Sequence, residues 1–139
     1  MRQAIHRLVI EPRRGKGLTE ITAPIVRWVT EQRITTGLLT AFCRHTSASL
    51  LIQENADPDV RTDLEAWFEQ AAPEDAPYVH DTEGPDDMPA HIRTALTSVS
   101  LAIPVEGGRP ALGMWQGIYL FEHRSGPHRR EIVLHLIGD

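Results

Sequence analysis

Two stretches near the C-terminus carry the apolar–polar alternation of β-strands, and they restrict the possible folds of this chain more than any other feature. Residues 116–124 and 131–137 both have a side-chain period of two, so each can turn one apolar face toward a core. In the first stretch, Glu122 continues the face formed by Ile118 and Leu120. A carboxylate in that place is unusual unless it reaches the sheet edge or a charged partner, so Glu122 is a candidate functional residue.

Further elements follow from shorter patterns. Apolar runs predict strands at residues 5–10, 38–43, 49–53 and 99–105. Helical spacing predicts helices at residues 22–33, at residues 57–72, and from a first turn containing Pro89 to about Ser98. There is no internal repeat and no βαβ alternation. The pattern predicts one α+β domain over residues 1–139, β-sandwich-like, with mixed or antiparallel sheets and about three short flanking helices.

Composition excludes several classes of function. The 139 residues include 14 Lys and Arg against 19 Asp and Glu, and a net charge of -5 argues against a nucleic-acid partner. Cys43 is the only cysteine, so no intrachain disulfide can form, which suits a reducing compartment. No apolar run approaches the ~20 residues that span a bilayer, and the first residues lack the apolar stretch of a signal peptide. We therefore expect a cytoplasmic protein with no membrane partner.

An acidic loop is the strongest electrostatic feature. Residues 83–91 contain three carboxylates, two prolines and a histidine, and His80 lies just before them. Adjacent carboxylates repel each other unless a cation, a proton or a helix N-terminus relieves them. Asp87 can cap the third predicted helix, which is the alternative to a functional role. Capping explains neither Asp86 nor His80.

Two other stretches are rich in polar or basic groups. Residues 44–49, Arg-His-Thr-Ser-Ala-Ser, follow a predicted strand, where hydroxyls and an imidazole suit an anion or a metal. His45 can equally be a structural residue. Residues 13–17 predict a basic turn, either solvated or anion-binding. Asp57 has a structural explanation, because it is placed to cap the second helix ahead of Pro58.

Four stretches together resemble a known family: residues 45–50 (HTSASL), 54–60 (ENADPDV), 83–91 (EGPDDMPAH) and 115–124 (WQGIYLFEHR). In their order and combination they resemble the YjbQ-like family, also called the secondary thiamine-phosphate synthase enzymes, over nearly the whole chain. Met114 departs from the family pattern, which has a small polar residue there. The resemblance implies a compact β-sandwich-like homotrimer with a site rich in histidines and acids near subunit boundaries.

The resemblance also implies an activity. Thiamine-phosphate synthase activity, weak or incidental in the family, joins a pyrimidine methyl diphosphate to a thiazole phosphate and releases pyrophosphate. A small phosphorylated metabolite is then the expected partner. Two alternatives stay open: a metal-assisted hydrolase of a small metabolite, and a non-catalytic trimer that binds a metal or a metabolite.

Three histidines are the candidate ligands of a divalent metal, zinc or magnesium, because neutral imidazoles bind such ions well: His45, His80 and His91. No compact motif such as His-Glu-x-x-His is present, so a hydrogen-bonded polar cluster without metal is the alternative. Asp86 and Asp87 are candidate catalytic residues that can hold a cation bridging the leaving diphosphate.

The remaining candidates lie in the matched motifs. Glu122 is the candidate proton acceptor or ligand-orienting group, and the planar fork of Arg124 suits a phosphate. The other substrate-binding candidates carry hydroxyl, amide or indole groups: Thr46, Ser47, Ser49, Asn55, Trp115 and Gln116. The hydroxyls can donate hydrogen bonds to phosphate oxygens. Trp115 can stack on a pyrimidine, or it can be an ordinary core or interface tryptophan.

Overall fold

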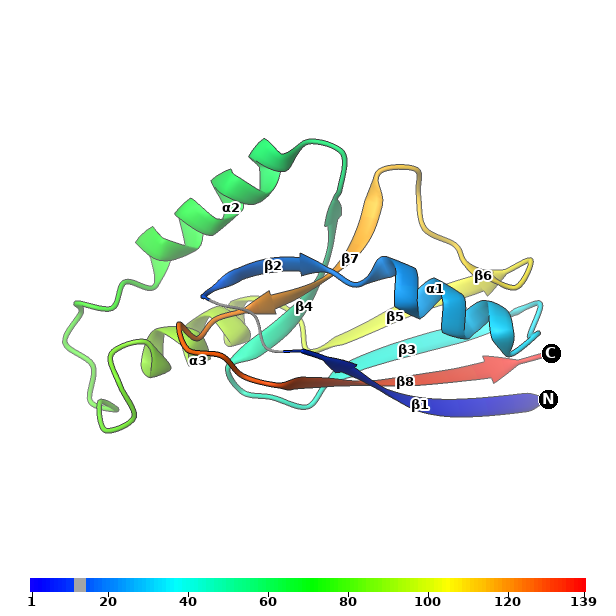
Figure 1. Ribbon diagram of the computed structural model, residues 1–139, viewed down its shortest axis with the longest axis horizontal. Helices are drawn as coiled ribbons and strands as arrows, with labels where there is room; N and C mark the ends of the chain where they lie inside the picture. The colour runs from blue at the N-terminus through cyan, green and yellow to red at the C-terminus, as the bar shows by residue number, and fades with distance from the viewer. Residues whose placement is uncertain (12–14) are drawn as a thin grey trace.

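The computed structural model describes residues 1–11 and 15–139, and these ranges contain eight β-strands and three α-helices (Figure 1). The strands are β1 (Arg2–Ile10), β2 (Gly17–Glu20), β3 (Gly37–Cys43), β4 (Ala48–Glu54), β5 (Ser100–Glu106), β6 (Arg109–Pro110), β7 (Gln116–Glu122) and β8 (Arg130–Gly138). The helices are α1 (Thr22–Glu31), α2 (Pro58–Ala71) and α3 (Asp87–Leu96). Arg13 and Arg14 of the predicted basic turn lie outside the described residues.

The strands form two antiparallel sheets. Five strands pair in the order β1-β8-β3-β5-β6, and three pair in the order β2-β7-β4. The two alternating stretches of the sequence become β7 and β8, each lying between two neighbours in its sheet. The predicted α+β class, with antiparallel sheets and three helices, is confirmed.

The main core lies between the two sheets. Ile118 and Leu120 of β7 are buried there together with Leu39 of β3 and Leu134 of β8, and α1 adds Ile25 to the same cluster. Each large apolar side chain taken out of water contributes about 1.5–3 kcal/mol, so this cluster is the main favourable term in folding. It also fixes the face of β7 on which Glu122 must lie.

Helix α2 covers the other face of the three-stranded sheet. The ring of Phe68 packs edge-on against that of Phe121, with 5.1 Å between centroids. The helix begins as predicted, because the Asp57 carboxylate accepts a hydrogen bond from the Asp59 amide at 2.9 Å and Pro58 is the first helical residue. The prediction of Asp57 as an N-cap is therefore confirmed.

The start of α3 determines the geometry of the site. Pro89 lies in its first turn, as predicted, where its missing N–H has no partner to lose. Asp87 is the first helical residue, and the N-cap position belongs to Asp86, whose side chain makes no capping bond. The capping alternative for Asp87 is thus not what the structure shows. His91 stands one turn after Asp87 on the same face of the helix.

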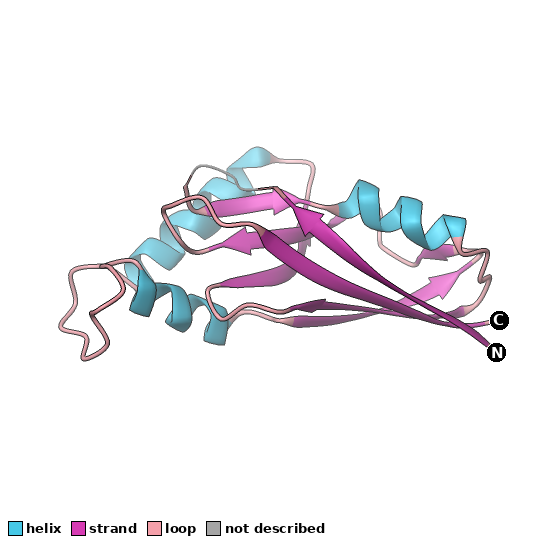
Figure 2. Ribbon diagram, turned by 60° about the horizontal axis from the view of Figure 1, so that its bottom comes forward, coloured by secondary structure: helices cyan, strands magenta, loops and turns pink. Residues whose placement is uncertain are grey.

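The outer face of the five-stranded sheet carries exposed apolar side chains. Leu38 and Phe42 alternate with the core-facing residues of β3, and Ile5 of β1 reaches the same face through its pairing with β8. Figures 1 and 2 place both termini at one end of this long sheet and α3 at the other. Within the described residues, no helix has the length and apolar character needed to cross a membrane.

Candidate functional site

Three potential metal ligands meet at the start of α3. The Oδ2 atom of Asp87 lies 2.7 Å from Nε2 of His80 and 3.2 Å from Nε2 of His91. One donor atom from each residue lies within 4.8 Å of the other two, a spacing that fits a shared ion. Asp87 and His91 come from α3, and His80 comes from the loop before it. We call these three residues the His80–Asp87–His91 cluster.

The hydrogen bond on the far side of His91 fixes the chemistry of its ring. Nδ1 of His91 lies 2.8 Å from the carbonyl oxygen of Thr46, and because a carbonyl only accepts, Nδ1 carries the proton. In the neutral ring, Nε2 is then a lone pair that faces a carboxylate oxygen of Asp87. Two acceptors in this arrangement need a proton or a cation between them. A backbone carbonyl that orients the ring in this way is typical of metal-binding histidines.

Arg124 relieves the repulsion between the adjacent carboxylates. Its Nε atom donates to Oδ2 of Asp86 at 2.9 Å, and its Nη1 atom donates to Oδ1 of Asp87 at 2.9 Å. The third nitrogen, Nη2, donates to the carbonyl of Glu83 at 3.1 Å, and the Ser125 amide also donates to Asp86. The three bonds use three of the five N–H donors of the guanidinium, so the role predicted for Arg124 on a phosphate stays a prediction.

Both carboxylates are kept ionised. Burial on its own would raise the pKa of Asp87, but its contacts with His80 and His91 and the charge of Arg124 outweigh burial and lower the pKa. Burial likewise opposes ionisation of Asp86, and the bonds from Ser125 and Arg124 lower its pKa overall. A carboxyl group with a lowered pKa is an anion at neutral pH and can bind a cation.

His45, the third predicted ligand, lies outside the His80–Asp87–His91 cluster. Its Nε2 atom accepts a hydrogen bond from the Glu131 amide at 2.9 Å, which ties the ring to β8. In the described residues, Asp87 takes the place in the cluster that the sequence had assigned to His45. The useful signal was the spacing of Asp87 and His91, which places an acid and an imidazole one helical turn apart.

Glu122 is buried in a salt bridge. Its side chain is about 2% exposed, and its two oxygens accept hydrogen bonds from Nε and Nη2 of Arg130. Oε2 of Glu122 also accepts from the backbone amide of Arg124 at 3.1 Å, and Arg130 donates to the carbonyl of Ser47. Glu122 therefore holds the end of β7, from which Arg124 reaches the two aspartates. In this arrangement Glu122 positions other groups, and both of its oxygens already accept hydrogen bonds from Arg130.

The predicted substrate residues separate into two groups. Ser49 is buried, with Oγ 2.9 Å from Nε2 of His123, whereas Thr46 lies at the surface beside His91. Asn55, Trp115 and Gln116 lie at the opposite end of β7 from Glu122: Gln116 pairs with Glu54, while Glu122 pairs with Ala48. Six residue steps along a strand amount to about 20 Å. Within one chain, those three residues cannot contact the same small ligand as the His80–Asp87–His91 cluster.

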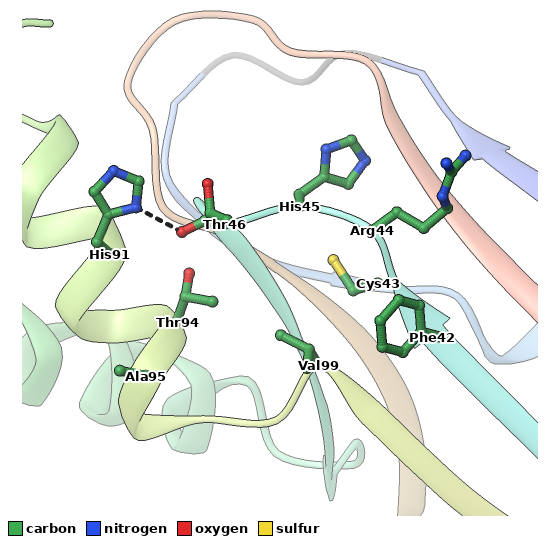
Figure 3. A pocket seen from close by; sticks show the side chains of 9 residues that line it. All are labelled: Phe42, Cys43, Arg44, His45, Thr46, His91, Thr94, Ala95 and Val99. Atoms are coloured by element: carbon green, nitrogen blue, oxygen red, sulfur yellow. Dashed lines mark hydrogen bonds between the residues drawn. The ribbon is translucent and has the colours of Figure 1, made fainter.

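A surface pocket of about 660 Å³ adjoins the cluster on its His91 side (Figure 3). We call it the His91 pocket. It is lined by residues from the end of β3, the following loop, α3 and the segment after it: Phe42, Cys43, Arg44, His45, Thr46, His91, Thr94, Ala95 and Val99. Sequence patterns pointed to Arg44, His45, Thr46 and His91 in this set. They gave no signal for Phe42, Thr94, Ala95 and Val99, because apolar and small residues on separate elements leave no local pattern.

Comparison with known proteins decides the family. The model for the family described as "UPF0047 protein YjbQ-like" matches residues 6–139. This chain belongs to the YjbQ-like family. It is 56% identical over 126 residues to the UPF0047 protein sll1880 of Synechocystis, covering 90% of this chain and 86% of that protein. It is 42% identical over 127 residues to YjbQ of Escherichia coli O157:H7, covering 91% and 92%.

Solved structures of similar proteins share the fold. A Clostridium acetobutylicum protein of the YjbQ/UPF0047 family superposes with a TM-score of 0.88 at 33% identity, covering 95% of this chain and 99% of the other. The conserved hypothetical protein TT1486 from Thermus thermophilus gives a TM-score of 0.84 at 35% identity, with the same coverage. None of these four proteins has a name that states a reaction, so the chemistry of the site has to indicate the activity.

Proposed function

We propose that this YjbQ-like chain is a metal-dependent enzyme of the cytoplasm that acts on a small phosphorylated metabolite. His80, Asp87 and His91 would hold the divalent cation. Two imidazoles and one carboxylate form the donor set of several catalytic zinc sites, whereas magnesium prefers oxygen ligands, so the set favours zinc. The His80 side chain is 44% exposed, so the cluster is accessible from solvent.

The observation that carries this proposal is the orientation of His91. In the neutral ring, the Nδ1–H bond to the Thr46 carbonyl makes Nε2 an acceptor that faces an ionised carboxylate. Such a pair is stabilised by a cation placed between its members. Arg124 supports the arrangement, since it neutralises part of the charge on Asp86 and Asp87 while leaving Oδ2 of Asp87 to the histidines.

Within this class we propose a transfer reaction with pyrophosphate as the leaving group, and thiamine-phosphate synthase activity is the specific case that the family resemblance implies. A bound divalent metal would supply positive charge for the oxygens of the departing diphosphate. The chain's own part is to fix the ligands: Thr46 orients His91, Arg124 holds Asp87, and Glu122 fixes the strand end that carries Arg124. Positioning of this kind favours the transition state because it costs no reorganisation during the reaction.

Hydrolysis is the second candidate function, and the donor set itself favours it. Zinc sites with two histidines and one carboxylate commonly activate water in the remaining position. The same three residues would then act on a small metabolite with water as the nucleophile. The two functions differ in their products, which makes them separable by one assay.

We also propose that the protein is a homotrimer. The exposed side chains of Ile5 and Leu38 on the outer face of the five-stranded sheet support assembly through that face. A contiguous apolar surface is expected to be covered in the working protein. Leu38→Glu should lower the mass measured by light scattering from three chains to one, and an unchanged trimer mass would move the interface elsewhere.

The test of function is a product assay with zinc or magnesium and with a chelator. The substrates are a pyrimidine methyl diphosphate with a thiazole phosphate, followed by a panel of phosphorylated metabolites with water alone. We expect pyrophosphate release, and we expect a chelator to abolish it. Asp86→Asn and His91→Ala should each abolish pyrophosphate release while the trimer survives. His6→Ala, at an exposed position on β1, is the matched control and should retain activity. Retained turnover in both site variants would contradict the proposal, and metal binding without turnover of any substrate would point to a non-catalytic protein.

A further inference from the structure

The His91 pocket has an apolar wall and two polar ends. Phe42, Ala95 and Val99 provide the apolar surface, and Figure 3 shows His91 and Arg44 on opposite sides of it. Its volume of about 660 Å³ lies within the range of pockets that bind small molecules, about 300–1,000 Å³. The pocket therefore has room for a compact molecule that extends from Arg44 to His91.

Arg44 is a cation that is only weakly paired. Its Nη1 atom lies 3.6 Å from Oε1 of Glu131, beyond hydrogen-bond distance, and its side chain is 45% exposed. The same oxygen of Glu131 lies 2.7 Å from Nη1 of Arg7, which is the stronger pair. None of the nine residues that line the pocket is acidic. Arg44 is thus available to bind an anionic group of a ligand.

His45 supplies a hydrogen-bond donor beside Arg44. Because its Nε2 atom accepts from the Glu131 amide, the neutral ring carries its proton on Nδ1. Among the residues that the structure describes, none accepts a hydrogen bond from that N–H. Burial and the charge of Arg130 lower the pKa of His45, so the neutral form persists at neutral pH. Arg44 and His45 both line the pocket, so a guanidinium and an N–H donor are available there for phosphate oxygens.

On the His80 side of the His80–Asp87–His91 cluster, the charge is opposite to that at Arg44. The two pockets that include His80 are lined by Asp81, and one of them also by Glu74, with no lysine or arginine in either lining set. An anionic ligand is repelled there and attracted at Arg44. The charge pattern therefore directs a phosphorylated molecule to the His91 side.

We infer that the His91 pocket binds a small planar molecule that carries a terminal phosphate. The phosphate lies at Arg44 and His45, the ring packs on Phe42 and Val99, and the far end of the molecule reaches His91. This inference rests on the proposed function for one point: the far end is the reacting end only if the His80–Asp87–His91 cluster holds a metal. The phosphate and ring contacts do not depend on the metal.

Phenyl phosphate is a suitable probe, with inorganic phosphate and phenol as its two halves. Isothermal titration of the full-length protein should show phenyl phosphate binding at least tenfold more tightly than either half. Arg44→Gln should weaken phenyl phosphate about tenfold, since it removes the charged partner of the phosphate. Arg109→Gln is the matched control, because it removes an exposed arginine that neither lines the pocket nor contacts Glu131. Ala95→Trp, at an exposed position on α3, should fill the pocket and abolish binding.

Three results would overturn the inference: equal binding of the probe and its halves, equal losses in Arg44→Gln and Arg109→Gln, or unchanged binding in Ala95→Trp. The titrations are repeated on chelator-treated protein, and zinc affinity is measured separately in Arg44→Gln. If phenyl phosphate binds in the pocket but the protein binds no zinc, this inference is supported and the proposed function is refuted. Zinc binding without any effect of Arg44→Gln on phenyl phosphate refutes this inference and leaves the proposed function intact.

Discussion

The buried imidazole of His123 makes the stability of this protein fall at acidic pH. His123 follows β7 and is 1% exposed, and its ring packs 4.4 Å from that of Phe121. Nε2 lies 2.9 Å from Oγ of Ser49, and Nδ1 is buried with no hydrogen-bond partner in the described residues. Burial, aided by the positive charges of Arg93 and other basic groups, lowers the pKa of His123 to about 3.

The sign and size of the effect follow from linkage. In the unfolded chain the pKa of His123 is about 6.5, so below that pH the unfolded chain binds a proton that folded His123 does not bind. The contribution of His123 to stability is therefore complete above pH 6.5 and is lost as the pH falls toward 3. A pH of 5 lies roughly 1.5 units below the unfolded pKa, which corresponds to a loss of about 2 kcal/mol of unfolding free energy. At pH 3, where folded His123 is itself half protonated, the loss would be about 4 kcal/mol.

Urea denaturation at pH 7.5 and pH 5.0 measures this loss. The His123→Gln variant should be less stable at pH 7.5 but should lose about 2 kcal/mol less than the wild type between the two pH values. His6→Gln, at an exposed position, is the control and should keep the wild-type loss. Equal pH dependence in His123→Gln and the wild type would refute the reasoning.

Two further outcomes follow from buried groups at the end of β7 and in β3. Arg130→Met leaves the buried carboxylate of Glu122 without its charged partner and should lower the unfolding free energy by about 3–5 kcal/mol. Adding Glu122→Leu should recover much of the lost unfolding free energy. A loss below about 1 kcal/mol in the single variant would show that the pair is not structural. Burial raises the pKa of the Cys43 thiol to about 11, so a thiol reagent at pH 8 should label Cys43 only after unfolding. Fast labelling of the native protein would contradict this.

The strands could be predicted where one face is buried. The alternation around Ile118 and Leu120 places β7 correctly, and it also places Glu122 toward the core, where Arg130 meets it. The four-residue strand β2 was not predicted, since four residues are too few to show a period. Its pairing with β7 depends on contacts more than 95 residues away in sequence, as in the register of Leu18 with Phe121.

The candidate site could be predicted in part. The acidic loop, with Asp86, Asp87 and His91, is the centre of the site because all three belong to one helix start. His45 was assigned to the metal because its residue type fits, but its hydrogen bond to β8 depends on tertiary packing that no local pattern encodes. Trp115 shares a motif with Arg124, yet the length of β7 separates them, because a strand advances about 3.3 Å per residue.

Zinc titration of chelator-treated protein tests the central claim most directly. We expect one zinc site per chain, and His91→Ala should weaken zinc binding by more than the 10–100-fold that loss of an outer hydrogen-bond partner costs. His45→Ala is the matched variant, since His45 lies in the same pocket but outside the His80–Asp87–His91 cluster, and it should leave zinc affinity within about twofold. Unchanged zinc binding in His91→Ala, or its loss in a folded His45→Ala protein, would contradict the account.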